Sequence, residues 1–258
     1  MKLVRKAVKI AALPGGLLAR RRPGDVIMLL YHRIRPGSAE IELSPAVFER
    51  QLAWLKEHDQ ILTLERALEP DADGGLVITF DDGTRDLHEH ALPTLISFQV
   101  PAVLYLATGS MQNDGGRGGD GLTWSQVAEL ASTGFVTVGS HTHSHRALSR
   151  VPEYVAEEEM RRSKELIEDH LGIPCRHFSY PFAVGSSGAD RAARRLFDTA
   201  ALDAWRTNRA NRIDPYRLGR TPVLRSDDHV FFVAKVRGLL DAEALAYRAR
   251  RRGPWRRR

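Results

Sequence analysis

The sequence LVITFDDG at residues 76–83 joins a continuously apolar segment directly to two carboxylates and a glycine. An apolar run of this kind is typical of a strand buried on both faces, as in a parallel sheet covered by helices. Other short apolar segments share this character, and helical patterns alternate with them. These segments are 26–31, 101–107, 135–139, 177–180, 198–202 and 218–224. The alternation predicts an α/β fold built on a mostly parallel sheet or barrel.

Helices are predicted between and after these strands. The first begins at Ser44, a good N-cap, with Pro45 in the first turn. The others cover 85–98, 123–134, 152–171 and 226–240. Strands and helices together form some seven β/α units, and no linker or shift in composition divides them. We therefore expect a single domain over residues 23–247.

The composition is that of a globular protein. Of the 258 residues, 43% are hydrophobic and 27% are charged, which excludes a disordered or collagen-like chain. The single cysteine, Cys175, excludes a framework of intramolecular disulfides. No apolar run approaches the roughly 18 residues needed to cross a bilayer, so the sequence predicts no transmembrane segment.

Basic residues are concentrated at the two ends of the chain. Residues 1–22 and residues 248–258 each carry seven basic side chains and no acidic one. Residues 23–247 therefore carry −8, the difference between the +6 of the whole chain and the +14 of its ends. Basic ends are typical of contact with an anionic surface, either phospholipid headgroups or RNA. For the acidic body we expect no specific binding of nucleic acid.

The N-terminal segment is a poor match to a secretory signal. Lys9 interrupts its apolar run, the PGG at 14–16 breaks it, and the RRR at 20–22 stands where a cleavage site would lie. We therefore expect a cytoplasmic protein that binds peripherally to the inner face of the membrane through its basic ends.

A second polar motif follows the predicted strand at 135–139, where residues 140–145 read SHTHSH. Histidines at positions i and i+4 converge on a metal ion from a helical turn, whereas those at i and i+2 converge from an extended segment. Either pair, with one carboxylate of Asp81 and Asp82, makes a three-ligand site with open positions for water. Such a site suits Zn²⁺-dependent hydrolysis and also non-haem Fe²⁺ chemistry. The other carboxylate can then act as a base.

Three motifs follow one another along the chain: TFDDG at 79–83, SHTHSH at 140–145 and FSYPF at 178–182. In this order they resemble the polysaccharide deacetylase family, whose shared core is the NodB homology domain. The resemblance covers about residues 25–240 and includes LYHR at 30–33 and LGR at 218–220. It implies a distorted (β/α)₇ barrel and the metal-dependent removal of acyl groups, usually N-acetyl groups, from sugars.

The resemblance also implies roles for individual residues. Asp82, His141 and His145 would bind a divalent metal ion, with Zn²⁺ expected, and Asp81 would be the general base. The base would take a proton from the attacking water. The backbone N–H near Phe182 would donate a hydrogen bond to the oxyanion that develops during hydrolysis.

The sequence departs from the family pattern at two places. Many members carry in the third motif an arginine that pairs with the base; Ser179 stands there, and Arg220 is the candidate to replace the arginine. Many members also carry a C-terminal histidine that acts as general acid, and no such motif follows residue 218. His32 is the first candidate for the acid, because it follows a strand that should end beside Asp81. His229 is the second, near the region where members carry their acid.

Three functions remain open on the sequence. The expected one is a hydrolase that removes N-acetyl groups from an amino sugar in a glycan or glycan precursor. An O-acetyl esterase acting on a glycan would use the same chemistry, and its alkoxide leaving group demands less of an acid than an amine does. The third is a catalytically silent sugar-binding or scaffold protein, against which Asp81 argues, because metal binding alone does not require it.

Overall fold

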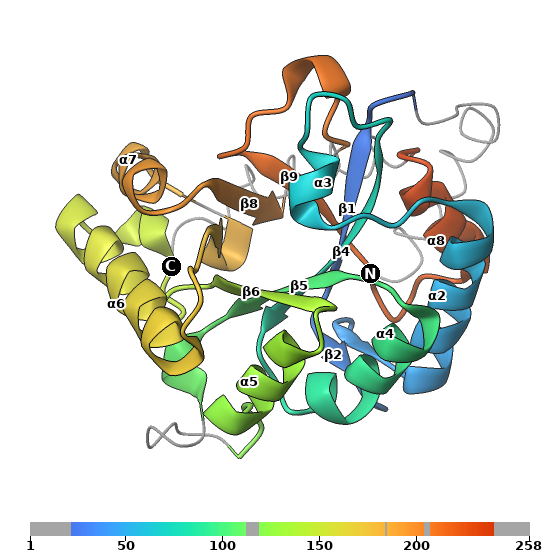
Figure 1. Ribbon diagram of the computed structural model, residues 1–258, viewed down its shortest axis with the longest axis horizontal. Helices are drawn as coiled ribbons and strands as arrows, with labels where there is room; N and C mark the ends of the chain where they lie inside the picture. Colours follow the sequence, from blue (N-terminus) through green and yellow to red (C-terminus); the bar gives the residue numbers. More distant parts are fainter. Residues whose placement is uncertain (1–21, 112–118, 184, 204–206, 240–258) are drawn as a thin grey trace, which may run out of the picture.

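Parallel strands form a closed barrel in the computed structural model of the protein, which describes residues 22–111, 119–183, 185–203 and 207–239 (Figure 1). In order around the barrel these strands are β1 (Val26–Tyr31), β4 (Gly75–Asp82), β5 (Ala102–Leu106), β6 (Val136–Ser140), β7 (His177–Ser179), β8 (Thr199–Asp203) and β9 (Leu218–Pro222). Met28 of β1 pairs with Arg220 of β9, which closes the sheet. The predicted single-domain (β/α)₇ barrel is confirmed.

Helices surround the strands (Figure 1). They are α2 (Pro45–His58), α3 (Leu64–Ala67), α4 (Leu92–Phe98), α5 (Trp124–Ser132), α6 (Glu153–Leu171), α7 (Ser187–Leu196) and α8 (His229–Val236). Helix α2 begins after Ser44 with Pro45 in its first turn, as the sequence predicts. Helix α5 begins with a reciprocal cap, in which the Thr123 hydroxyl accepts from the Gln126 N–H and the Gln126 side chain accepts from the Thr123 N–H.

Several helical segments differ from their prediction, among them the short helix α3, which the sequence does not predict. The helix predicted over 85–98 begins with a π-helical turn, Leu87–Ala91, before α4. Pro93 accounts for this change, because proline lacks the N–H that a continuous α-helix would use there. Helix α7 is not predicted at all, although the Ser186 hydroxyl caps it by accepting from the Ala189 N–H. Its buried residues are three alanines and Gly188, so it lacks the large apolar side chains that mark a helical pattern.

Residues along each strand alternate between the barrel interior and the layer under the helices. Val77, Tyr105 and Leu218 belong to the interior cluster, whereas Ile78 and Leu104 pack against the helices. Both sets are almost completely buried, which explains why the strands read as continuous apolar runs. A polar residue at an interior position must therefore find its partner across the barrel.

A small sheet that the sequence does not predict lies beyond β1. Strand β2 (Arg33–Ile34) pairs in parallel with β3 (Glu42–Leu43). Each has only two residues, too few for a pattern of hydrophobicity to appear. This sheet carries Arg33 to the rim of the barrel.

Several predictions fall on residues that the structure does not describe. Nearly all of both basic ends lie there, because the description begins at residue 22 and stops at residue 239. Residue 240, the predicted end of the last helix, lies there as well, but within the described residues the helix already ends at Val236. Among the described helices, none is both long and apolar enough to cross a membrane.

Candidate active site

The two aspartates of the TFDDG motif end strand β4. Asp81 lies on the same face of the strand as Val77, so its side chain enters the barrel interior, where it is almost fully buried. Asp82 has a left-handed backbone (φ 74°), and Gly83 after it has one too (φ 84°). This turn places the Asp82 carboxylate at the rim, where it lines a pocket. The neighbouring carboxylates therefore occupy different environments.

His141 follows strand β6 and is held at both its backbone and its ring. Its N–H donates to the Leu106 carbonyl at 2.9 Å, and its Nδ1 lies 2.8 Å from the Ser179 carbonyl oxygen. Because a carbonyl oxygen only accepts, Nδ1 carries the proton in this hydrogen bond. In the neutral ring, Nε2 then keeps its lone pair, as a metal ligand requires.

The chain turns after His141 and brings His145 back beside it. Thr142 and His145 have left-handed backbones, with φ of 67° and 54°, and the centroids of the His141 and His145 rings are 4.9 Å apart. His143 contacts Thr108 instead, with its Nδ1 3.0 Å from the threonine Oγ1. Of the two pairings that the motif allows, the structure brings together the histidines at i and i+4.

Asp82 completes a group of three potential metal ligands with these histidines. Its Oδ1 lies 3.4 Å from the His145 Nε2 and 3.9 Å from the His141 Nε2. One ligand atom from each residue lies within 4.8 Å of the other two. Burial lowers the pKa of His141, which keeps its ring neutral and able to bind a cation. One carboxylate and two imidazoles grouped in this way fit a divalent cation with open positions.

Arg220 binds the carboxylate of Asp81, and Ser179 in turn binds Arg220. The guanidinium Nη1 and Nη2 donate to the two carboxylate oxygens at 2.6 and 2.7 Å, and Nη2 also donates to the Ser179 hydroxyl at 2.8 Å. Burial alone would raise the pKa of Asp81, but the charge of Arg220 and the hydrogen bonds that it donates outweigh this effect and hold the pKa well below its usual range. Arg220 thus occupies the place that the sequence analysis assigned to it as a candidate.

The other predicted site residues lie at different distances from this centre. His32 is half-buried and directly follows Tyr31 of β1, which pairs in register with Phe80, the residue before Asp81. Phe182 has a left-handed backbone (φ 56°), and its ring centroid lies 4.8 Å from that of His145. His229 instead packs edge-on against Trp54 of α2, at 5.8 Å between centroids, in the outer helical layer.

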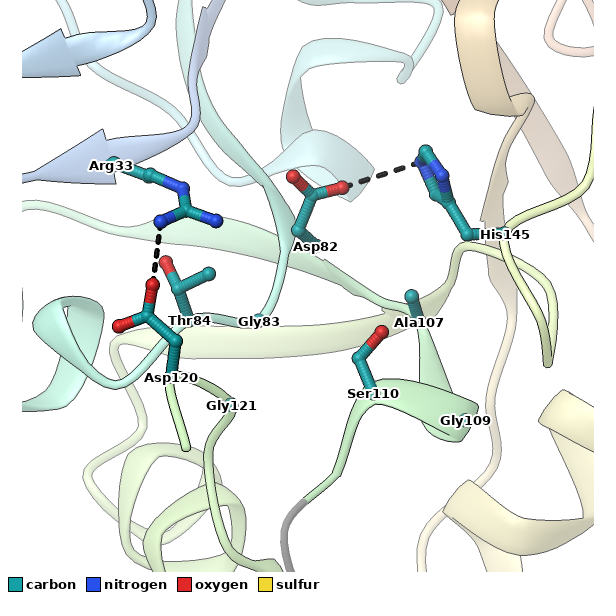
Figure 2. A pocket seen from close by; sticks show the side chains of 10 residues that line it. All are labelled: Arg33, Asp82, Gly83, Thr84, Ala107, Gly109, Ser110, Asp120, Gly121 and His145. Atoms are coloured by element: carbon teal, nitrogen blue, oxygen red, sulfur yellow. Dashed lines mark hydrogen bonds and ion pairs between the residues drawn. The ribbon is translucent and has the colours of Figure 1, made fainter. Parts of the chain in front are cut away.

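A pocket of about 380 Å³ opens beside the predicted metal ligands (Figure 2). Arg33 and Asp120 lie on one side, His145 lies opposite, and Asp82 stands between them. Arg33 and Asp120 are not among the site residues predicted from the sequence. The only signal for Arg33 is its place directly after His32 in the LYHR motif, and Asp120 lies in a glycine-rich stretch without a pattern.

A seven-stranded parallel barrel with an Asp-Asp pair and two histidines at the ends of its strands defines a class of α/β hydrolytic barrel. A model of the family described as polysaccharide deacetylase matches residues 69–198, half of the chain. The protein therefore belongs to the polysaccharide deacetylase family.

The curated relatives include poly-β-1,6-N-acetyl-D-glucosamine N-deacetylases. The one from Staphylococcus epidermidis is 25% identical over 200 residues, which cover 66% of this chain and 69% of that protein. One from Staphylococcus aureus is 24% identical over 192 residues, which cover 63% of this chain and 66% of that protein. The alignments thus span about two thirds of the length of these relatives.

Solved structures share the fold. The deacetylase PplD from Streptococcus pyogenes, in complex with acetate, has a TM-score of 0.74 at 22% identity and covers 83% of this chain and 99% of its own. IcaB from Ammonifex degensii has a TM-score of 0.71 at 24% identity and covers 84% of this chain and 98% of its own. At these identities the likeness concerns the fold.

Proposed function

We propose that this protein is a metal-dependent deacetylase that hydrolyses N-acetyl groups of an amino sugar in a glycan or glycan precursor. The observation that carries the proposal is the buried, ionised Asp81 beside the group formed by Asp82, His141 and His145. Membership of the polysaccharide deacetylase family supports the reaction class. The relatives that deacetylate poly-β-1,6-N-acetyl-D-glucosamine support an N-acetylated amino sugar as the substrate.

In this proposal Asp82, His141 and His145 hold the cation, and Zn²⁺ suits their mixture of nitrogen and oxygen donors. A divalent cation held there supplies Lewis acidity, which makes a water molecule more acidic and polarises the amide carbonyl. The hydrogen bond from the His141 Nδ1 to the Ser179 carbonyl fixes the ring so that Nε2 faces the site.

Asp81 is proposed as the base that accepts the proton of the attacking water. Its lowered pKa means that it is ionised at neutral pH, and the pair with Arg220 fixes the orientation of both carboxylate oxygens. Its Oδ2 lies 3.6 Å from the His141 Nε2, so the base and the predicted ligands share one small space. Arg220 acts through Asp81 and is a positioning residue.

Two further groups complete the proposed reaction. The backbone N–H of Phe182 donates to the carbonyl oxygen as negative charge develops on it. His32 donates a proton to the leaving amine, because an amine departs poorly unless it is protonated. Of the two candidate acids, His32 follows β1 beside the end of the paired strand β4, where Asp81 lies, whereas His229 packs against Trp54.

The test is acetate release by the purified, metal-analysed protein from a panel of acetylated glycans. The panel contains oligomers of β-1,6-linked and of β-1,4-linked N-acetylglucosamine together with an O-acetylated xylan. We expect acetate from at least one N-acetylated oligomer, stoichiometric free amine and a bound divalent metal. Acetate from the O-acetylated glycan alone would replace the amide with an ester as the substrate bond. A protein that releases no acetate from any of them would overturn the proposal.

A further inference from the structure

We propose that the pocket beside the predicted metal ligands is a subsite for one neutral sugar residue. Arg33 and Asp120 recognise the hydroxyl groups of that residue. This inference rests on the proposed function, because the sugar is part of the deacetylase substrate. It adds the chemical class of the sugar that the pocket accepts.

The size and place of the pocket suit a single ring. Its volume of about 380 Å³ lies near the lower end of the roughly 300–1,000 Å³ of ordinary ligand pockets. Asp82 and His145 form part of its wall, so a ring bound in it is next to the predicted metal ligands (Figure 2).

The opposite wall offers hydrogen-bond donors and acceptors side by side. The Arg33 Nη1 donates to the Asp120 Oδ2 at 2.6 Å, and the two side chains remain 25% and 48% exposed. A sugar hydroxyl both donates and accepts, so a guanidinium next to a carboxylate complements it. The exposed parts of both side chains leave hydrogen-bonding capacity open to a ligand in the pocket.

The charges around this wall balance, which favours a neutral ligand. Asp120 accepts hydrogen bonds from Arg35 as well as from Arg33, and Arg35 also pairs with Glu42. Two guanidinium groups thus stand against two carboxylates. An anionic substituent on the sugar would meet an arginine that is already paired with a carboxylate.

Arg35 provides a matched control for Arg33. Both arginines bind the Asp120 carboxylate, and their exposure is similar at 29% and 25%. Only Arg33 lines the pocket. If Arg33 served merely to hold Asp120 in place, removal of either arginine would have the same effect.

The experiment compares Arg33→Ala and Arg35→Ala with the unaltered protein. The substrates are a tetramer of N-acetylglucosamine and a tetramer in which alternate residues are uronic acids. Initial rates of acetate release give KM and kcat. If no acetate is released, calorimetric titration with the same tetramers gives their affinity. Thermal unfolding shows that both variants are folded.

We expect Arg33→Ala to raise KM for the neutral tetramer by about tenfold or more, the usual effect of losing a hydrogen bond to a charged group. Its kcat should change by less than about threefold, since the lost contact binds ground state and transition state alike. Arg35→Ala should keep KM within about threefold of the unaltered protein. The unaltered protein should prefer the neutral tetramer to the uronic acid tetramer.

Each other outcome has a definite meaning. Equal effects of the two substitutions, or a preference for the uronic acid tetramer, would overturn the inference and leave the proposed deacetylase function standing. Binding that depends on Arg33 without acetate release would uphold the subsite and overturn the deacetylase. Absence of both binding and acetate release would overturn both.

Discussion

The guanidinium of Arg220 on β9 binds both oxygens of the Asp81 carboxylate on β4, at 2.6 and 2.7 Å, inside the barrel. The same guanidinium also lies over the aromatic ring of Tyr105, with its Cζ 5.2 Å from the ring centroid. Ser179 is small enough to leave room for the guanidinium and accepts a hydrogen bond from it. A buried charge pair of this kind is strongly coupled, because either partner alone would be a buried and uncompensated charge.

Removal of Arg220 should therefore destabilise the fold. We expect Arg220→Met to cost about 3–5 kcal/mol in free energy of unfolding, because it leaves the Asp81 carboxylate buried without its cation. The double variant Arg220→Met/Asp81→Leu should recover much of that loss. Urea denaturation measures both. The control is Arg191→Met, which breaks an exposed pair with Glu153 and should cost less than about 1 kcal/mol. Equal losses in the single and double variants would show that the charges are not coupled.

The three predicted metal ligands should each be needed for metal binding. Replacement of Asp82, His141 or His145 by Ala should reduce the metal content of the purified protein from near-stoichiometric to a small fraction, as measured by elemental analysis. His143→Ala is the matched control, because His143 lies between the ligands in sequence but contacts Thr108. Full metal content in a His141→Ala/His145→Ala double variant would reject the assignment.

Asp81 should contribute to the rate and not to metal binding. Asp81→Asn keeps the shape of the side chain but removes the proton acceptor, so we expect about 10²–10⁴-fold lower kcat with unchanged metal content. Acetate release and elemental analysis on the same preparation separate the two effects. Near-normal turnover by Asp81→Asn would eliminate this residue as the base.

The sequence predicts the barrel strands well because their signal is local. Each predicted apolar segment overlaps a strand, and the segment at 26–31 coincides with β1. The features that the sequence does not predict either leave a weak local pattern or depend on residues far apart in the chain. Helix α7 buries alanines, which leave little trace in a hydrophobic pattern. Closure of the barrel depends on β1 pairing with β9, which the order of elements along the chain does not determine.

The same distinction applies to the candidate site. The motifs around Asp81 and His141 predict a metal centre because their residue types are unusual directly after apolar strands. The pair between Arg220 and Asp81 joins positions 139 residues apart, and only the family resemblance, with Ser179 in place of the usual arginine, makes Arg220 a candidate partner. Arg33 and Asp120 are 87 residues apart and meet only because β2 reaches the rim of the barrel.

Acid should weaken the link between helix α3 and the barrel. The Glu65 Oε1 on α3 lies 2.9 Å from the Nε2 of the buried His177, whose Nδ1 lies 3.0 Å from the Thr199 hydroxyl. The hydrogen bond with His177 lowers the pKa of Glu65 from 4.5 to about 2 against the opposing effect of burial. Because the folded-state pKa is depressed, the stabilisation is complete above about pH 4.5 and is lost as the pH falls towards about 2.

The check is the difference in Tm between the unaltered protein and Glu65→Gln. Glutamine keeps an oxygen acceptor but has no charge, so the difference should be largest at pH 6–7 and should shrink as the pH falls to about 3. Glu89→Gln, at an exposed glutamate, should show no such trend. A difference for Glu65→Gln that is constant across this range would show that the charge of Glu65 does not contribute.

The last prediction concerns the proton that an amine leaving group needs. His32 is half-buried and follows β1 beside the end of β4 that carries Asp81, and His229 is exposed against Trp54. We expect His32→Ala to lower kcat for an N-acetylated oligomer by about 10²-fold or more, the lower end of the usual effect of general acid catalysis. For an acetyl ester with a good leaving group, such as 4-nitrophenyl acetate, the loss should be far smaller, because that group departs without protonation.

His229→Ala is the control, since its ring lies in the outer helical layer, and both rates should remain close to those of the unaltered protein. The comparison requires that His32→Ala retain its metal, which elemental analysis of the same sample establishes. The ratio of the loss on the amide to the loss on the ester identifies the acid, because a general distortion of the site would slow amide and ester cleavage alike. Equal losses on both substrates would remove His32 from the role of acid, and a selective loss of amide cleavage in His229→Ala would assign that role to His229.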